Sequence, residues 1–221
     1  MRELSWTAVR GLAKQCSYRE IVDNLLGYLF SVLTGAEGKL VTAEERIGVL
    51  RGVGALASHG VGGGEPGHSI SAMASTHYRA LLKDEVHEGT TVVALETFGA
   101  WAQKFNGRLP EEAIALFKEG LTVKKSAQIR LAYLECLYSS CQANVLHSAT
   151  ALAPPLLTVL EQGLKQPNLY SYEILYASFI LLKLSRVDAS LEIKMSSFWK
   201  AFNEKQIFTN EKFITGLSDS G

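Results

Sequence analysis

The chain contains side chains of types that could catalyse a reaction, but each lacks the neighbouring groups that catalysis requires. A cluster of Asp84, Glu85, His87 and Glu88 resembles a general acid–base set, but it directly precedes an expected helix. Negative charge is favourable at a helix N-terminus, so we interpret this cluster as a helix start. The serine pairs at 139–140 and 196–197 have no neighbouring base in the sequence that would activate a nucleophile. The chain is therefore not expected to be an enzyme.

A glycine-rich stretch, GVGGGEPG at 60–67, invites comparison with loops that cradle phosphate groups. Such a loop needs a preceding strand and a following Lys-Ser/Thr pair, and the sequence offers neither. Glycines and a proline in this density end a helix and connect it to the next. We predict a flexible loop over 60–68.

Neither histidine nor cysteine spacing predicts a metal site, and we expect no cofactor. His77 falls on an apolar helical stripe and is expected to be a core or inter-helix histidine. Cys16, Cys136 and Cys141 make an odd number without a C-x-x-C pair. We interpret them as small buried hydrophobic residues in a reducing cytosol.

The only candidate contact residues are basic. Lys124 and Lys125 lie in a tight turn between two expected helices, and Arg130 follows about one and a half turns into the second helix. These three residues could contact a phosphate backbone or a protein partner. The alternative is an ordinary solvated turn. The whole chain has 22 Lys+Arg and 22 Asp+Glu, so its overall charge does not steer it toward nucleic acid or membrane.

The elements that carry these residues repeat. A helical pattern restarts about every 40 residues, a period typical of stacked helix pairs of the HEAT or armadillo kind. The second helix of a pair is expected over 91–105, 127–140 and 171–185. The sequence predicts an all-α solenoid of about four to five helical hairpins, and such an array provides a long surface without an active-site cleft.

Local signals set the helix limits between these repeats. Thr42 and Glu45 form a capping box that starts a helix over 43–58, and Pro110 suits a first helical turn. A first helix of the fourth pair is expected from Thr150, with two prolines in its first turn. Further helices are expected over the following ranges: 4–15, 17–34, 189–203 and 210–217.

The whole chain, 1–221, is interpreted as a single solenoid segment that is open at both ends and belongs to a longer array, with a disordered tail at 218–221. Arg2, Glu3 and Arg10 interrupt any signal peptide. The strongest apolar run, Ile174–Leu182, is about half the length of a membrane span. We therefore expect a cytoplasmic protein without a membrane partner.

Several ordered strings are more specific than the period. They are HEGTTVVALETFGAWAQKF at 87–105, VKKSAQIRLAYLECL at 123–137, LLKLSRVDASLEIKMSSFW at 181–199 and QIFTNEKF at 206–213. In this order the chain resembles the N-terminal HEAT-repeat region of the general control nonderepressible translational activator family.

The resemblance implies a ribosome-associated scaffold that stimulates the starvation-responsive kinase of initiation factor two alpha. It also implies ribosome and protein partners for the full-length array, with kinase binding through regions outside this chain. No binding residue is carried over, because no motif of this chain corresponds to one. The alternative is an adaptor or cargo-binding HEAT solenoid of another family, such as a transport receptor or a phosphatase scaffold. Such proteins would show ordered acidic or Asn/Trp ladders, and the sequence has none.

Overall fold

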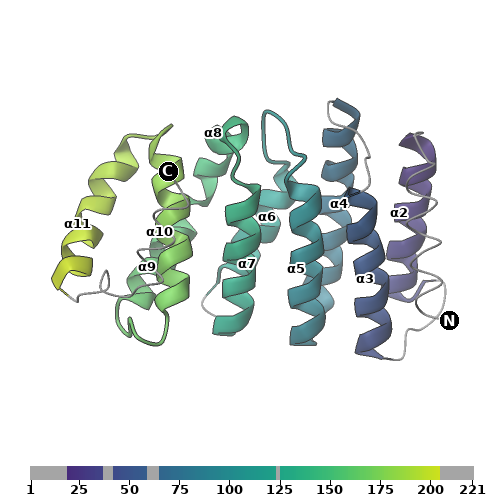
Figure 1. Cartoon of the computed structure of the whole chain (residues 1–221), viewed down its shortest axis with the longest axis horizontal. Helices are drawn as coiled ribbons and strands as arrows, with labels where there is room; N and C mark the ends of the chain where they lie inside the picture. Colours follow the sequence, from purple (N-terminus) through teal and green to yellow (C-terminus); the bar gives the residue numbers. More distant parts are fainter. Residues whose placement is uncertain (1–18, 37–41, 59–64, 123–124, 205–221) are drawn as a thin grey trace. The chain divides into compact units, whose positions relative to one another are not determined.

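Helices form every regular element that the structure describes (Figure 1). The structure is a computed structural model, and it describes residues 19–36, 42–58, 65–122 and 125–204. The α-helices are α2 (Arg19–Thr34), α3 (Ala43–Ser58), α4 (Glu65–Asp84), α5 (Glu88–Ala102), α6 (Glu111–Gly120), α7 (Ala127–Ser140), α8 (Leu146–Ala149), α9 (Ala153–Gly163), α10 (Ser171–Ser185) and α11 (Ser190–Glu204). Two short 3-10 turns, η1 (Ala143–Val145) and η2 (Thr150–Leu152), flank α8. No strand occurs in these ranges, and the predicted all-α fold of stacked hairpins is confirmed.

The chain divides into two units, Met1–Phe117 and Lys118–Gly221, with the boundary inside α6. In the first unit, α2 packs on α3 and α4 packs on α5, which makes two hairpins. The first helices, α2 and α4, also contact each other, as do the second helices, α3 and α5. Each helix thus contacts its partner in the hairpin and the equivalent helix of the next hairpin, as in stacked helical repeats.

An aromatic cluster fills the first unit. Tyr78 lies 5.0 Å from Phe30 and 5.1 Å from Phe98 between ring centroids, and Phe98 in turn lies 6.0 Å from Phe117. Tyr78, Phe98 and Phe117 are completely buried. The buried Trp101 donates its indole N–H to the Val53 carbonyl at 3.2 Å, which fixes α5 against α3. Buried indole and phenol groups need such partners, so the polar atoms of this core also set the helix register.

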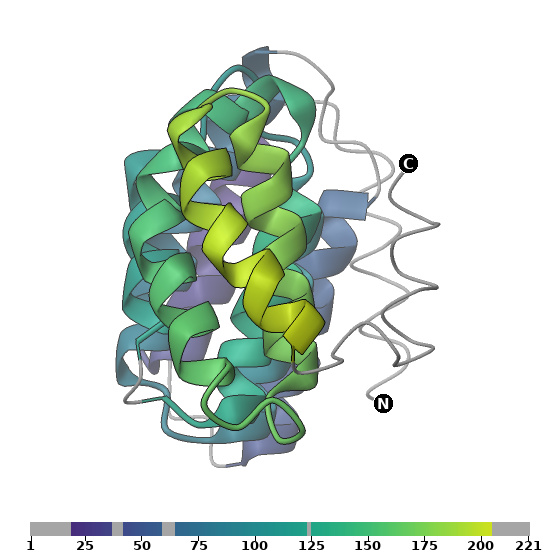
Figure 2. The ribbon, with the colours of Figure 1, turned by 90° about the vertical axis from the view of Figure 1, so that its left-hand side faces the viewer.

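In the second unit α10 is the central helix, because α7, α8, α9 and α11 all pack on it. Figure 2 shows α11 crossing obliquely at this end of the chain. The buried side chains of α10 occur on both sides of the helix, among them Ile174, Phe179, Ile180 and Leu184. A helix that is apolar nearly all round must be covered on several sides, and four neighbours provide that cover.

The predicted capping box is confirmed. Thr42 accepts from the Glu45 N–H at 3.2 Å, and the Glu45 carboxylate accepts from the Thr42 N–H at 3.1 Å. Each side chain thereby satisfies a backbone donor that the first turn of α3 would leave unpaired. At the other end of the preceding helix, Gly35 takes a φ of 83°, and the Ala36 N–H donates to the Ser31 carbonyl at 2.8 Å. Only glycine adopts this backbone readily, so α2 stops here.

Several boundaries differ from the prediction. The helix predicted over 91–105 is α5, which begins and ends three residues earlier, at Glu88 and Ala102. The helix expected from Thr150 begins only at Ala153, because two prolines in its first turn fix the start, and the residues before it form η1, α8 and η2. Of the loop predicted over 60–68, residues 65–68 belong to α4, which begins at Glu65, and residues 60–64 lie outside the described residues. Pro66 falls in the first turn of α4, where its missing N–H has no helical partner to lose. The predicted segments 4–15, 210–217 and 218–221 lie outside the described residues.

One stretch corrects the expectation that no segment reaches membrane-spanning length. Ala143–Gly163 is 21 residues long and apolar enough by composition. In the structure this stretch contains the two 3-10 turns, and 44% of the apolar 18-residue window within it is buried. Its buried leucines, Leu152, Leu156 and Leu160, belong to the core of the second unit. A packed core segment accounts for its hydrophobicity.

Candidate functional site

The structure places the predicted basic residues in different surroundings. Arg130, on α7, is almost buried, with 11% of its side chain exposed. Lys125 lies in the turn before α7 and is half-exposed, while Lys124 lies outside the described residues. Arg130 donates to the Lys125 carbonyl, so the arginine holds this turn against the start of its own helix.

The charge of Arg130 is already matched by Glu173 of α10. Two hydrogen bonds join the pair, Nη2 to Oε1 at 3.3 Å and Nε to Oε2 at 3.4 Å. The guanidinium also lies over the ring of Tyr170, 5.8 Å from its centroid. Arg130 therefore ties α7 to α10, and the phosphate contact predicted for the three basic residues stays a prediction.

Burial makes the Arg130–Glu173 pair electrostatically expensive. Only 6% of the Glu173 side chain is exposed, and the loss of hydration raises its pKa, although Arg130 pulls it back down. Both hydrogen bonds are longer than the roughly 2.8 Å typical of charge-assisted contacts. A pair of this kind contributes less to stability than to specifying which helices meet.

A small cavity of about 190 Å³ opens beside this pair in the second unit. Arg130 and Glu173 form its charged wall, and Gln162, Lys165 and Gln166 supply amides and an ammonium group. The rest of its lining is Leu121, Thr158, Val159, Gly163 and Tyr170. This lining contains no cysteine, histidine or serine. The cavity can hold water or a small polar group.

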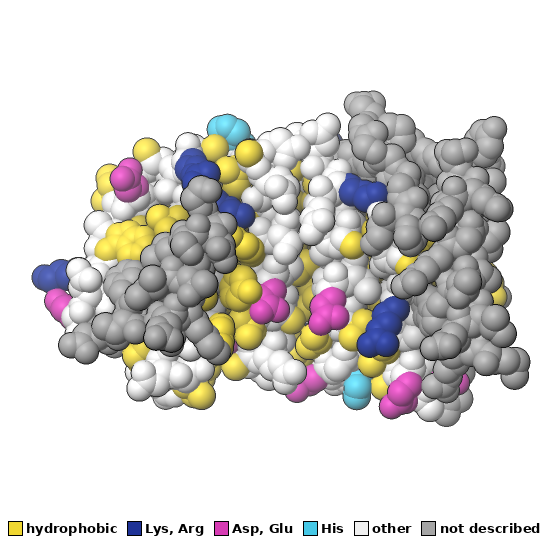
Figure 3. All heavy atoms as spheres, viewed as in Figure 1, with side chains coloured by type: hydrophobic (Ala, Val, Ile, Leu, Met, Phe, Trp, Pro, Cys, Tyr) yellow, Lys and Arg dark blue, Asp and Glu magenta, His cyan; other side chains and the backbone are white. Residues whose placement is uncertain are grey.

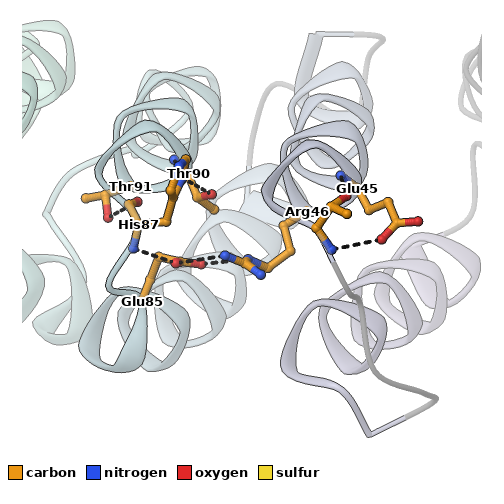
Figure 4. Close-up of polar contacts among 7 residues, drawn as sticks. Glu45, Arg46, Glu85, His87, Thr90 and Thr91 are labelled. Atoms are coloured by element: carbon orange, nitrogen blue, oxygen red, sulfur yellow. Dashed lines mark hydrogen bonds and ion pairs between the residues drawn. The ribbon is translucent and has the colours of Figure 1, made fainter.

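The acidic cluster before α5 forms a helix cap and an ion pair (Figure 4). The His87 Nδ1 accepts from the Thr90 N–H at 3.1 Å, which makes His87 the N-cap of α5. Glu85 binds Arg46 of α3 through two hydrogen bonds, at 3.0 and 3.2 Å, and accepts from the His87 N–H at 2.9 Å. The interpretation of this cluster as a helix start is confirmed for His87, the N-cap, and for Glu88, in the first turn of α5. Asp84 instead ends α4, and Glu85 pairs with Arg46.

The inter-helix position predicted for His77 and the buried positions predicted for Cys136 and Cys141 are confirmed. His77 stacks on Phe30 with ring centroids 4.8 Å apart, and burial lowers its pKa. Cys136 and Cys141 are free and buried, and burial raises the pKa of both thiols, that of Cys141 to about 12. Thiols of this kind are poor nucleophiles at neutral pH. No group of three potential metal ligands occurs among the described residues.

Comparison with known proteins gives a clear result. The chain is 35% identical over 217 residues to the stalled ribosome sensor GCN1 of Homo sapiens. It resembles a segment of GCN1. The mouse GCN1 is also 35% identical, over 219 residues, and the Arabidopsis thaliana protein ILITYHIA is 22% identical over 198 residues.

The human match covers 96% of this chain and 8% of GCN1, so the chain spans a small part of its relatives. No protein-family model matches the chain, and no solved structure matches it significantly. The resemblance to the translational activator is confirmed, while the position of the segment within GCN1 stays a prediction.

Ion pairs join successive repeats, and they were not among the residues predicted from the sequence. Arg46 pairs with Glu85, Arg79 with Glu112 and Arg130 with Glu173, at sequence separations of 39, 33 and 43 residues. Each separation is close to one repeat. Residues of opposite charge that lie about one repeat apart in the sequence therefore predict these ion pairs.

Proposed function

We propose that this chain is a non-catalytic HEAT-repeat scaffold segment of a ribosome-associated translational regulator. The observation that carries the proposal is the 35% identity to a stalled ribosome sensor across nearly the whole chain. The stacked hairpins support it, because such arrays present long surfaces for macromolecular partners.

The finer proposal is that the full-length array stimulates the initiation-factor kinase of the amino-acid starvation response in the cytoplasm. Its partners would be the ribosome and ribosome-bound proteins, with the kinase engaged by regions outside this chain. Within this segment, the ion pairs one repeat apart would keep neighbouring hairpins in a fixed relation, so that contacts made at different places on the array stay correctly spaced.

The test replaces this segment in the full-length protein with a helical-repeat segment of equal length and unrelated surface. Co-sedimentation with translating ribosomes and phosphorylation of initiation factor two alpha are then measured in starved cells. We expect both to fall, because a neutral replacement keeps the spacing and removes the native surface. If both stay unchanged, the segment is a spacer and the scaffold proposal fails.

A point variant tests whether the turn before α7 contacts the ribosome directly. Lys125→Glu replaces a positive side chain by a negative one at a half-exposed position of the turn before α7, and leaves the Lys125 carbonyl that accepts from Arg130 in the chain. A loss of ribosome binding at low salt that exceeds the loss at high salt would support the predicted phosphate contact.

A further inference from the structure

The cavity beside Arg130 and Glu173 carries more positive than negative charge. Two of its lining side chains are cations, Arg130 and Lys165, and one is an anion, Glu173. Because Arg130 and Glu173 pair with each other, the charge of Lys165 is left over. The Lys165 ammonium donates to the Gln162 Oε1 at 3.0 Å, and this acceptor is neutral. The lining therefore has one net positive charge, two cations against one anion.

The acidic residue that lies nearest along α9 does not neutralise Lys165. Glu161 precedes Lys165 by four residues, and both side chains are exposed. Within the part of the chain that the structure describes, neither residue takes part in an ion pair. Lys125 adds a further cation at this end of α7, because its carbonyl accepts from Arg130 and its side chain is half-exposed. An anion that approaches the cavity is therefore attracted.

The unused hydrogen-bonding groups of the cavity are mainly donors. A guanidinium has five N–H donors, and the bonds of Arg130 to Glu173 and to the Lys125 carbonyl leave some of them unused. An ammonium has three, and Lys165 spends one on Gln162, whose amide N–H groups stay available. A carboxylate accepts about four hydrogen bonds and donates none, so it complements this lining.

The volume of the cavity limits its occupant to about one side chain. Its roughly 190 Å³ is less than the roughly 300 Å³ at which pockets for whole small molecules begin. An apolar contact lies beside it, because Leu169 is 67% exposed and donates its backbone N–H to the carbonyl of the lining residue Gln166 at 3.0 Å. Figure 3 shows hydrophobic side chains at the surface below the start of α10, where this connection lies.

We propose that this cavity binds the carboxylate of a glutamate or aspartate in an acidic segment of a protein partner. Lys165 would neutralise the carboxylate, and Arg130 and Gln162 would donate further hydrogen bonds to it. Leu169 would contact an apolar side chain next to the bound acid. A doubly charged phosphate matches less well, because the lining has a single net positive charge and Glu173 is part of the wall. The proposal does not depend on ribosome association.

The experiment titrates the full chain against a short fluorescent peptide that repeats serine, glutamate and leucine, and follows polarisation at low salt. The control peptide carries glutamine in place of glutamate. We expect saturable binding of the acidic peptide alone, and Lys165→Gln should weaken it about two- to fivefold. Lys200→Gln is the matched control, because it removes the same charge from an exposed lysine of α11 outside the cavity. This control should bind like the wild type.

A second variant separates the cavity from a general effect of charge. Thr158→Phe keeps the charge and adds a ring to the cavity wall at an exposed position of α9, so it should block binding. Leu169→Ser should weaken binding of the leucine peptide and leave binding of a peptide with alanine in place of leucine unchanged. Circular dichroism of each variant, all changed at exposed positions, confirms that the fold is kept.

The proposal is overturned if Thr158→Phe binds like the wild type, or if Lys200→Gln weakens binding as much as Lys165→Gln. It is also overturned if the glutamine peptide binds equally well. Displacement of the peptide by inorganic phosphate, at concentrations where acetate of equal ionic strength has no effect, would identify a phosphate site instead. Free glutamate that binds as tightly as the peptide would identify a metabolite site, and either result overturns the proposal.

Discussion

The Arg130–Glu173 pair makes a quantitative prediction, because its two side chains are nearly buried and their contact is loose. Arg130→Met keeps most of the aliphatic bulk and leaves the Glu173 carboxylate buried without its cation. Removing one partner of a buried pair costs about 3–5 kcal/mol. The long hydrogen bonds of 3.3 and 3.4 Å put this pair at the lower limit. We expect the free energy of unfolding to fall by about 3 kcal/mol at neutral pH.

The double variant Arg130→Met/Glu173→Met distinguishes a lost pair from lost packing. Replacing both charges with apolar groups of similar volume is often neutral or stabilising. We therefore expect the double variant to lie within about 1 kcal/mol of the wild type. Urea unfolding followed by far-ultraviolet circular dichroism measures both differences. If the double variant is as unstable as Arg130→Met, the cost is packing and the electrostatic reasoning is refuted.

The pH dependence of Arg130→Met gives an independent check. Burial already raises the pKa of Glu173 in the folded protein, and the loss of Arg130 raises it further, because that residue is what lowers it. The folded state then binds a proton more tightly than the unfolded state, so stability rises as the pH falls. The gain relative to wild type should begin near the raised folded pKa and be complete below the ordinary glutamate pKa. The double variant, which lacks the carboxyl group, should not show this gain.

Two further predictions concern α3 and α5 of the first unit. Gly54→Ala should destabilise the chain by about 1–2 kcal/mol in urea unfolding, because the new Cβ would lie 2.8 Å from the Cγ2 of Thr97. The control is Gly27→Ala in α2, where no atom lies near the new Cβ, and this variant should be more stable than the wild type by up to about 1 kcal/mol. Equal effects of the two substitutions would contradict the packing argument. His87→Ala should lower the free energy of unfolding by about 1 kcal/mol, because the Thr90 N–H loses its acceptor. His87→Asp should recover this stability, because aspartate is a good N-cap residue.

Helix periodicity predicted most of the fold, because the apolar stripes and local caps act within a single helix. The limits of α3, α7 and α10 agree with the predicted ranges 43–58, 127–140 and 171–185. The segment before α9 was predicted less well. Its apolar residues at 143–152 suit a helix, but the two prolines allow α9 to start only at Ala153, and tertiary packing decides the conformation of what precedes it.

The candidate site was harder to predict, because its character depends on contacts between helices. The sequence correctly places Arg130 near a basic turn, yet it does not show that Glu173, 43 residues later, takes up the charge.

The ion pairs between repeats help to set the register in which neighbouring hairpins pack. In a solenoid each hairpin contacts only its neighbours, so the register of every contact must be set locally. Leucine-rich faces bury well in more than one register, whereas a buried cation has few acceptable partners. Arg46–Glu85 in the first unit and Arg130–Glu173 in the second therefore exclude alternative registers that the apolar contacts alone would tolerate. The register matters for function because a surface that is shared by two helices exists only when those helices pack in one register.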